Sequence, residues 1–172
     1  SQTETGIIKH ELRPPVDLNT LPFIDSDSFE KERIYRPMQG KIYAMLHVEL
    51  DRGCPYNCTY CGAPSLKKTY RERTGCGYYR QKDIDHIIDE MIYLKKKFNP
   101  GYIDFNSETF LARSLDDLQR FAARYKEEIN LPFWCQSRPE TVTEEKVALL
   151  KDMGCRNLQF GIEHGNEEFR KR

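Results

Sequence analysis

Three cysteines lie close together in the run RGCPYNCTYCG, at Cys54, Cys58 and Cys61. Their C-x3-C-x2-C spacing places three soft thiolate ligands on one short loop, and no fourth cysteine lies nearby. A structural zinc site needs four protein ligands and a ferredoxin cluster needs four thiolates, so three thiolates favour an iron–sulfur cluster with one open metal corner. We therefore interpret the loop as a catalytic metal centre.

Two other functions remain compatible with this loop. One is a zinc-stabilised interaction domain, and the other is an iron–sulfur electron-transfer module. The remaining cysteines, Cys76, Cys135 and Cys155, are scattered, so they do not predict an auxiliary cluster. Without a secretory signal, all six cysteines are expected to be reduced thiols or metal ligands instead of disulfides.

The composition indicates one domain of ordinary size. The chain has 172 residues, and its 27 basic and 27 acidic residues balance, so total charge favours neither nucleic acid nor a membrane surface. The N-terminal run SQTETGIIKHELRPP lacks the apolar core of a signal peptide, which predicts a cytoplasmic protein. The chain starts at Ser1 and stops at Arg172, shortly after Asn166 could cap a helix, as expected of a piece of a longer protein.

The order of apolar patterns predicts an α/β fold. We expect residues 1–40, which hold several prolines, to form a linker or extended arm, and KIYAMLHVEL to form the first strand. Helical spacing follows at 84–98, at 114–129 behind Ser114, and at 143–154, where Val147, Leu150 and Met153 should be buried. Between these helices lie the predicted strands YIDFN, FWCQS and NLQFGI.

Alternating strands and helices predict parallel strands joined by right-handed crossovers. We therefore assign residues 41–172 to a partial (βα) barrel of about four units, half of an eight-unit barrel. Its polar motifs, the cysteine loop, SETF, SRPE and EHG, all follow strands and should meet at the carboxyl edge of the sheet. The last strand should have an unpaired edge, which predicts self-association of the chain.

The cysteines, with the aromatic Tyr60 before the last of them, resemble the CxxxCxΦC signature of the radical S-adenosylmethionine (SAM) superfamily over about residues 42–172. The resemblance implies that Cys54, Cys58 and Cys61 hold three irons of a [4Fe-4S] cluster while SAM chelates the fourth. It further implies a reductant such as flavodoxin or ferredoxin, and reductive cleavage of SAM to a 5′-deoxyadenosyl radical that modifies a substrate the sequence does not identify.

The resemblance also implies SAM contacts. Tyr60 would meet the adenine, although an aromatic side chain can also simply pack the loop. Ser107 and Glu108 stand where the family often has a Gly-Gly-Glu run that binds the methionine ammonium; the two glycines are absent here, and Glu108 could equally be a solvated loop residue.

Further contacts are implied after the third and fourth strands. Arg138 and Ser137 would bind the SAM carboxylate, unless Arg138 forms a salt bridge with Glu140 or Glu163. Glu163 would accept hydrogen bonds from the ribose hydroxyls. We assign no role to His47 or His164, because a lone histidine near a strand is usually structural, and no catalytic side chain is identified.

Two segments bear on the reaction type. The lead-in LPFIDSDSFEKERIYRPMQGK resembles the connector of cobalamin-dependent radical SAM enzymes, which implies cobalamin and methyl transfer in the parent protein. The basic, tyrosine-rich segment 67–80 is best interpreted as a solvated surface loop, and the alternative is an RNA-binding surface of an RNA-modifying enzyme.

Overall fold

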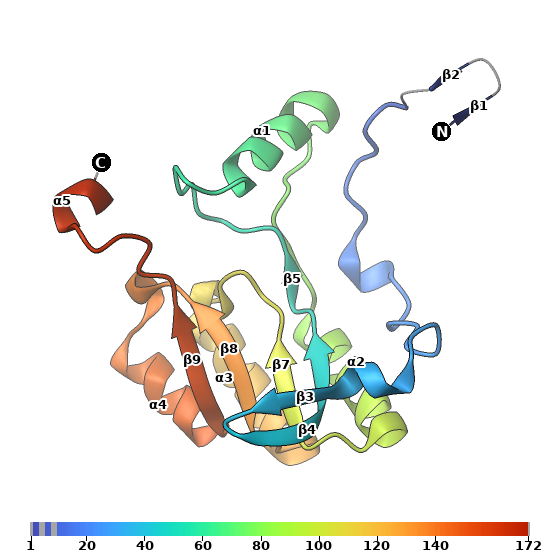
Figure 1. The fold of residues 1–172 in the computed structure, drawn as a ribbon, viewed down its shortest axis with the longest axis vertical. Helices are drawn as coiled ribbons and strands as arrows, with labels where there is room; N and C mark the ends of the chain where they lie inside the picture. The colour runs from blue at the N-terminus through green and yellow to red at the C-terminus, as the bar shows by residue number, and fades with distance from the viewer. Residues whose placement is uncertain (1, 4–5, 8–9, 172) are drawn as a thin grey trace.

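The computed structural model describes residues 2–3, 6–7 and 10–171, and a five-stranded sheet in the order β3-β4-β7-β8-β9 lies at its centre (Figure 1). β4, β7, β8 and β9 run parallel, and β3 pairs antiparallel with β4. The α/β fold with parallel strands is therefore confirmed. The bounds of these strands are Tyr35–Met38 for β3, Lys41–Val48 for β4, Tyr102–Phe105 for β7, Phe133–Ser137 for β8 and Cys155–Phe160 for β9.

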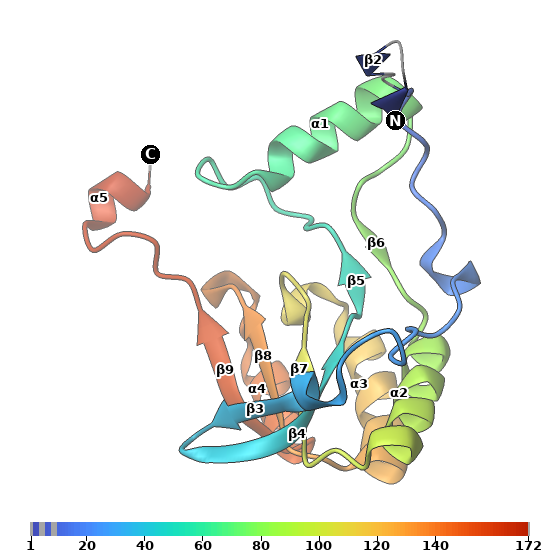
Figure 2. The same cartoon turned by 45° about the vertical axis from the view of Figure 1, so that its right-hand side comes forward.

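Three helices connect the parallel strands and cover one face of the sheet (Figures 1 and 2). They are α2 (Ile84–Phe98), α3 (Leu115–Arg124), continued by a π-helical turn (Tyr125–Ile129), and α4 (Glu144–Asp152). Ser114 and Thr143 cap α3 and α4 by accepting from backbone N–H groups of the first turn. These helices agree with the apolar spacing of the sequence.

The core lies between these helices and the sheet. Phe105 of β7 is fully buried, and its ring lies 5.0 Å from that of Phe133 and 5.1 Å from that of Phe110, measured between centroids. Leu150 and Met153 of α4 are buried as expected, but Val147 is 44% exposed. That expectation was wrong because no described element covers the side of α4 that carries Val147.

The N-terminal segment contains more structure than the expected arm. Besides the short pair β1 (Gln2–Thr3) and β2 (Gly6–Ile7) and two 3-10 turns, it supplies β3, which forms a hairpin with β4. The hairpin turn has positive φ at Gln39 and Gly40. Its tip crosses toward the far edge of the sheet, where Gln39 Nε2 donates to Asn157 Oδ1 of β9 at 2.9 Å.

The carboxyl edge of the sheet carries an excursion that the sequence analysis did not predict as a helix. β5 (Asp51–Arg52) and β6 (Arg80–Gln81) pair antiparallel, and α1 (Ala63–Thr74) lies between them in sequence. Both ribbon views place α1 beyond the arrowheads of the parallel strands (Figures 1 and 2). None of the residues of α1 is buried, so the sequence has no apolar stripe that would predict this helix. Pro64 in its first turn and Gly75 at its end are nevertheless typical of the start and the end of a helix.

Candidate functional site

The cysteine loop lies between β5 and α1, on the same side of the sheet as the other polar strand ends (Figure 2). Cys54 and Cys58 are half-buried, Cys61 is exposed, and none of the three forms a disulfide. The Cys61 N–H donates to the Cys58 carbonyl at 3.2 Å, which closes a turn around the last two cysteines. Cys54 Sγ lies 3.9 Å from Thr109 Oγ1, so the loop approaches the segment that follows β7.

The donor set fits an iron–sulfur cluster in its chemistry. Three unpaired, solvent-accessible thiols on one loop are the soft ligands that such a cluster requires. Among the described residues, however, no three His, Cys, Asp or Glu side chains are already placed to hold a metal ion. The sulfur atoms must therefore move together when a cluster binds.

Arg138, at the end of β8, reaches this loop. Its guanidinium lies 4.5 Å above the ring of Tyr56, and its Nη1 contacts Cys58 Sγ. Its Nη2 pairs with Glu140, so the salt bridge weighed as the alternative for Arg138 is present. Hydrogen bonding to Glu140 raises the pKa of Arg138 further above its already high value.

Tyr60 and Glu163 approach each other across the open edge. Desolvation, with hydrogen bonds to Cys58 and Glu163, raises the pKa of Tyr60 to about 12, and its side chain is 63% exposed. Glu163 has a φ of 65°. Its Oε1 would lie 2.2 Å from a Cβ at position 161, so any side chain larger than that of Gly161 would displace the carboxylate.

Ser107 and Ser137 turn away from the open edge. The Ser107 hydroxyl, whose residue is 1% exposed, lies 2.8 and 2.7 Å from the two carboxylate oxygens of Asp51. Ser137 accepts from the Leu111 N–H at 3.2 Å and shares a hydrogen bond with Thr141 Oγ1. Both hydroxyls therefore hold loops together inside the protein.

Glu108 lies beside Ser107 but points outward. It is exposed, and no hydrogen bond or ion pair of its carboxylate is present among the described residues. Its negative charge is free to meet a cation such as an ammonium group.

Asp51 is the acidic member of a buried network beneath the cysteine loop. Burial raises its pKa from 3.8 to about 6, against the opposing hydrogen bond from Ser107 and the positive charge of Arg113. Arg113 Nη2 donates to the carbonyls of Leu50 and Lys82 at 2.8 and 3.0 Å. Ser107 and Asp51 thus join the end of β7 to the base of the excursion that carries the cysteines.

The sequence analysis assigned no role to His47, which lies on the sheet face opposite the helices. His47 Nδ1 lies 2.7 Å from Asp104 Oδ2 on the neighbouring strand. Asp104 Oδ1 is buried and has no hydrogen-bond partner among the described residues. His47 and Asp104 are each the second-last residue of their strand. In parallel neighbouring strands this shared position places both side chains on the same face of the sheet, so the sequence contained a signal for this pair. His164 is structural, since its Nδ1 accepts from the Asn166 N–H at 3.0 Å.

The remaining cysteines lie apart from the site, as expected. Cys135 is fully buried in β8, and Cys155 is half-buried at the start of β9. Cys76 is half-buried after α1, where its Sγ donates to the Thr74 carbonyl at 3.5 Å.

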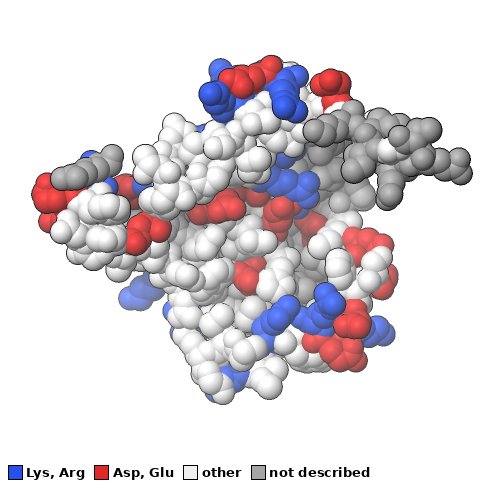
Figure 3. Space-filling view, turned by 45° about the horizontal axis from the view of Figure 1, so that its top comes forward, with Lys and Arg blue, Asp and Glu red and all other residues white. Residues whose placement is uncertain are grey.

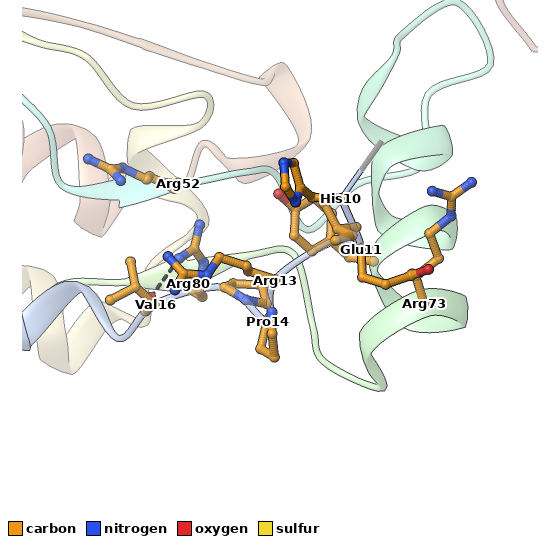
Figure 4. A pocket seen from close by; sticks show the side chains of 11 residues that line it. His10, Glu11, Arg13, Pro14, Val16, Arg52, Arg73 and Arg80 are labelled. Carbon is orange, nitrogen blue, oxygen red and sulfur yellow. Dashed lines mark hydrogen bonds between the residues drawn. The ribbon is translucent and has the colours of Figure 1, made fainter. Parts of the chain in front are cut away.

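Basic side chains gather at a different place from the cysteines. A cavity of about 860 Å³ lies between residues 10–16, Arg52, Arg80 and α1. In Figure 4, Arg73 lies on the opposite side of the view from Arg52 and Arg80, so these guanidinium groups do not gather at one point. Arg80 is also engaged, donating to the Val16 carbonyl at 2.6 Å. On the face visible in Figure 3, positive and negative side chains are interleaved, with no broad positive patch among the described residues on that face.

Comparison with known proteins establishes the class of this chain. A model of the Radical SAM superfamily matches residues 48–172, which is more than half of the sequence. The chain therefore belongs to the radical SAM superfamily, as the resemblance of its cysteine loop indicated. No described helix combines the length and the apolar character needed to cross a membrane.

Individual relatives share parts of the sequence. The chain is 29% identical over 120 residues to an uncharacterized methyltransferase of Pyrococcus horikoshii, a match covering 67% of this chain and 24% of that protein. It is 24% identical over 168 residues to the ribosomal protein uS12 methylthiotransferase RimO of Clostridioides difficile, covering 94% and 35% respectively.

A solved structure shares the fold. The radical SAM methyltransferase TsrM from Kitasatospora setae, solved with its tryptophan substrate and a SAM analogue, superposes with a TM-score of 0.56 at 22% identity. That match covers 72% of this chain and 23% of TsrM. The chain thus spans between about a quarter and a third of the length of these relatives.

Proposed function

We propose that this chain forms part of a radical SAM enzyme in which Cys54, Cys58 and Cys61 bind a [4Fe-4S] cluster. The observation that carries the proposal is the set of three free thiols on an accessible loop at the carboxyl edge of the parallel sheet, in a chain of this superfamily. When bound, the cluster and SAM supply a 5′-deoxyadenosyl radical through reductive cleavage of SAM.

The residues around the loop then have distinct roles toward SAM. Glu108 offers an unpaired carboxylate to the methionine ammonium, and Arg138 offers a guanidinium to the methionine carboxylate. The Arg138–Glu140 pair must open for this, which Glu140 permits because its side chain is 60% exposed. Tyr60 and Glu163 face the adenosine portion.

Ser107 and Ser137 act indirectly in this proposal. Their hydroxyls are held by Asp51 and Thr141, so they fix the shape of the loops that follow β7 and β8. We therefore propose that Ser107 and Ser137 do not contact SAM. They position the neighbouring residues Glu108 and Arg138, which do.

For the whole protein we propose methyl transfer assisted by cobalamin. Relatives named as a methyltransferase, a methylthiotransferase and the radical SAM methyltransferase TsrM support this reaction type, and a further TsrM structure contains cobalamin and a [4Fe-4S] cluster. The electron donor would be a low-potential protein such as flavodoxin or ferredoxin. Free cysteines suit a reducing compartment such as the cytoplasm.

The test is anaerobic reconstitution of the full chain with iron and sulfide, followed by iron analysis and electron paramagnetic resonance of the reduced protein. We expect a [4Fe-4S] signal that changes when SAM is added, and no such signal from the Cys54→Ala/Cys58→Ala/Cys61→Ala variant. Failure of the wild-type chain to form a cluster, or an identical signal from the triple variant, would refute the proposal.

The same experiment separates the alternatives. An electron-transfer module would give a cluster signal that SAM does not change, and a zinc-stabilised domain would bind zinc stoichiometrically in preference to iron. The unpaired carboxylate of Glu108 beside the cysteine loop favours the enzyme, because neither alternative needs a ligand for a cationic cofactor.

A further inference from the structure

A lysine of α1 reaches back to the cysteine loop. Lys67 Nζ donates to the Pro55 carbonyl at 2.9 Å and to the Tyr56 carbonyl at 2.7 Å. Both carbonyls lie between Cys54 and Cys58. The Lys67 ammonium group therefore connects the first half of the cysteine loop to α1, the helix that follows the loop.

This contact matters because few hydrogen bonds hold the backbone of the loop. Within the described residues 54–61, backbone-to-backbone hydrogen bonding is limited to the turn from Cys61 N–H to the Cys58 carbonyl, and the Ala63 N–H donates to Cys61 Sγ at 3.4 Å. α1 buries no residue, so no side chain of this helix is anchored in the core. Lys67 thus supplies a direct tie between α1 and the part of the loop that precedes Cys58.

Tyr56 is held from a second direction. Its carbonyl accepts from Lys67, while its ring lies 4.5 Å beneath the guanidinium of Arg138 from the end of β8. Two cationic side chains from separate elements thus converge on Tyr56, one of the three residues between Cys54 and Cys58. A cation over an aromatic face and a charged donor to a carbonyl are both favourable contacts.

We propose that Lys67 is a positioning residue for the cluster: it clamps the Pro55–Tyr56 segment to α1, so that less chain must be ordered when the three thiolates gather on iron. This inference rests on the proposed function. Because the sulfur atoms are not yet gathered in the structure, the clamp restricts the loop backbone and leaves the thiols free to move.

The neighbouring lysine provides a matched control. Lys68 has the same charge on the same helix, but its side chain is 76% exposed and lies 3.9 Å from Glu72 Oε1, with no contact to the loop. A general effect of positive charge on α1 would appear in variants of both lysines, whereas the clamp concerns Lys67 alone.

The experiment compares Lys67→Met, Lys68→Met and the conservative Lys67→Arg in the full chain after anaerobic reconstitution. Loss of the cluster to excess EDTA is followed by visible absorbance. We expect Lys67→Met to lose its cluster at least about tenfold faster than wild type, since each of the two lost hydrogen bonds comes from a charged donor and one such bond is typically worth about a factor of ten or more. Lys68→Met should match wild type, and Lys67→Arg should recover much of the difference.

Equal rates for Lys67→Met and wild type, or equal acceleration by Lys68→Met, would overturn the proposal. Circular dichroism and denaturant unfolding check that the core is intact, as expected since α1 buries no residue. A second readout needs no cluster: amide hydrogen exchange in residues 56–61 should be faster in metal-free Lys67→Met than in metal-free Lys68→Met. If wild type forms no cluster, the proposed function fails, while this exchange comparison still decides the clamp.

Discussion

At the scale of single residues, the site depends on buried polar groups as much as on the cysteines. Asp51 sits three residues before Cys54 and holds Ser107 through both carboxylate oxygens. Its burial raises its pKa to about 6, so near neutral pH the fold carries a partly desolvated negative charge at the base of the cysteine loop.

This shift predicts a pH dependence. Because the folded-state pKa of Asp51 lies above its ordinary value of 3.8, the folded protein binds this proton more tightly than the unfolded chain does. The stabilisation is complete below about pH 4 and is lost as pH rises through about 6. Asp51→Asn should remove this dependence. The free energy of unfolding of the variant minus that of wild type should therefore be about 2 kcal/mol larger at pH 7 than at pH 4, so the variant gains stability relative to wild type as pH rises.

Urea unfolding of both proteins at the two pH values measures this difference, and Asp116→Asn on the exposed surface of α3 serves as the control. A difference between Asp51→Asn and wild type that stays constant with pH would contradict the assignment of a raised pKa to Asp51.

At the scale of elements, a buried ion pair lies at α2, and its carboxylate also binds the N-terminal segment. Lys82 Nζ lies 2.7 Å from Glu90 Oε2, and both side chains are almost fully buried. The other carboxylate oxygen of Glu90 accepts from the Ile24 N–H at 2.9 Å. Glu90 therefore ties the chain before β3 to the helix that covers β4, while Lys82 balances its charge.

Removal of one partner should be costly. Lys82→Met leaves Glu90 as an uncompensated buried charge, so we expect a loss of about 3 kcal/mol in the free energy of unfolding. The double variant Lys82→Met/Glu90→Gln should recover part of that loss. Lys126→Met, which breaks an exposed pair with Asp152, should cost less than about 1 kcal/mol.

Denaturant unfolding measures all three variants. A loss in Lys82→Met no larger than that in Lys126→Met would show that Glu90 finds compensation elsewhere.

At the scale of the whole molecule, β9 is the edge of the described sheet. Phe160 at its end is 38% exposed, and Ile162 just beyond it is 66% exposed. An edge strand with exposed apolar side chains can pair with another chain, so the prediction of self-association is retained.

Light scattering tests the predicted self-association. The isolated chain should associate as concentration rises, and Phe160→Lys/Ile162→Lys should shift it toward the monomer because charge opposes edge pairing. Leu66→Lys serves as the control, since Leu66 is 44% exposed on α1, a helix that is not part of the sheet. A wild-type monomer at all concentrations, or association unchanged in the double variant, would contradict this interpretation.

Much of this protein could be predicted from local patterns. Strand and helix alternation predicted the parallel sheet, because periodicity reflects which face of an element is buried. The spacing of Cys54, Cys58 and Cys61 predicted the superfamily, because three thiolates on one short loop are a local property. Polar α1 lacked such a signal, and Val147 was assigned to the core from a periodicity that does not show which faces have a neighbour.

Long-range contacts were decided only by the tertiary structure. Ser107 turned toward Asp51, 56 residues earlier, and Arg138 approached Cys58, 80 residues earlier. Sequence spacing carries no information about which of two adjacent polar side chains points outward, so Ser107 and Glu108 looked equivalent until the packing separated them. The cysteines themselves were evident from the sequence, whereas the lysine that holds their loop became evident only once α1 was folded against it.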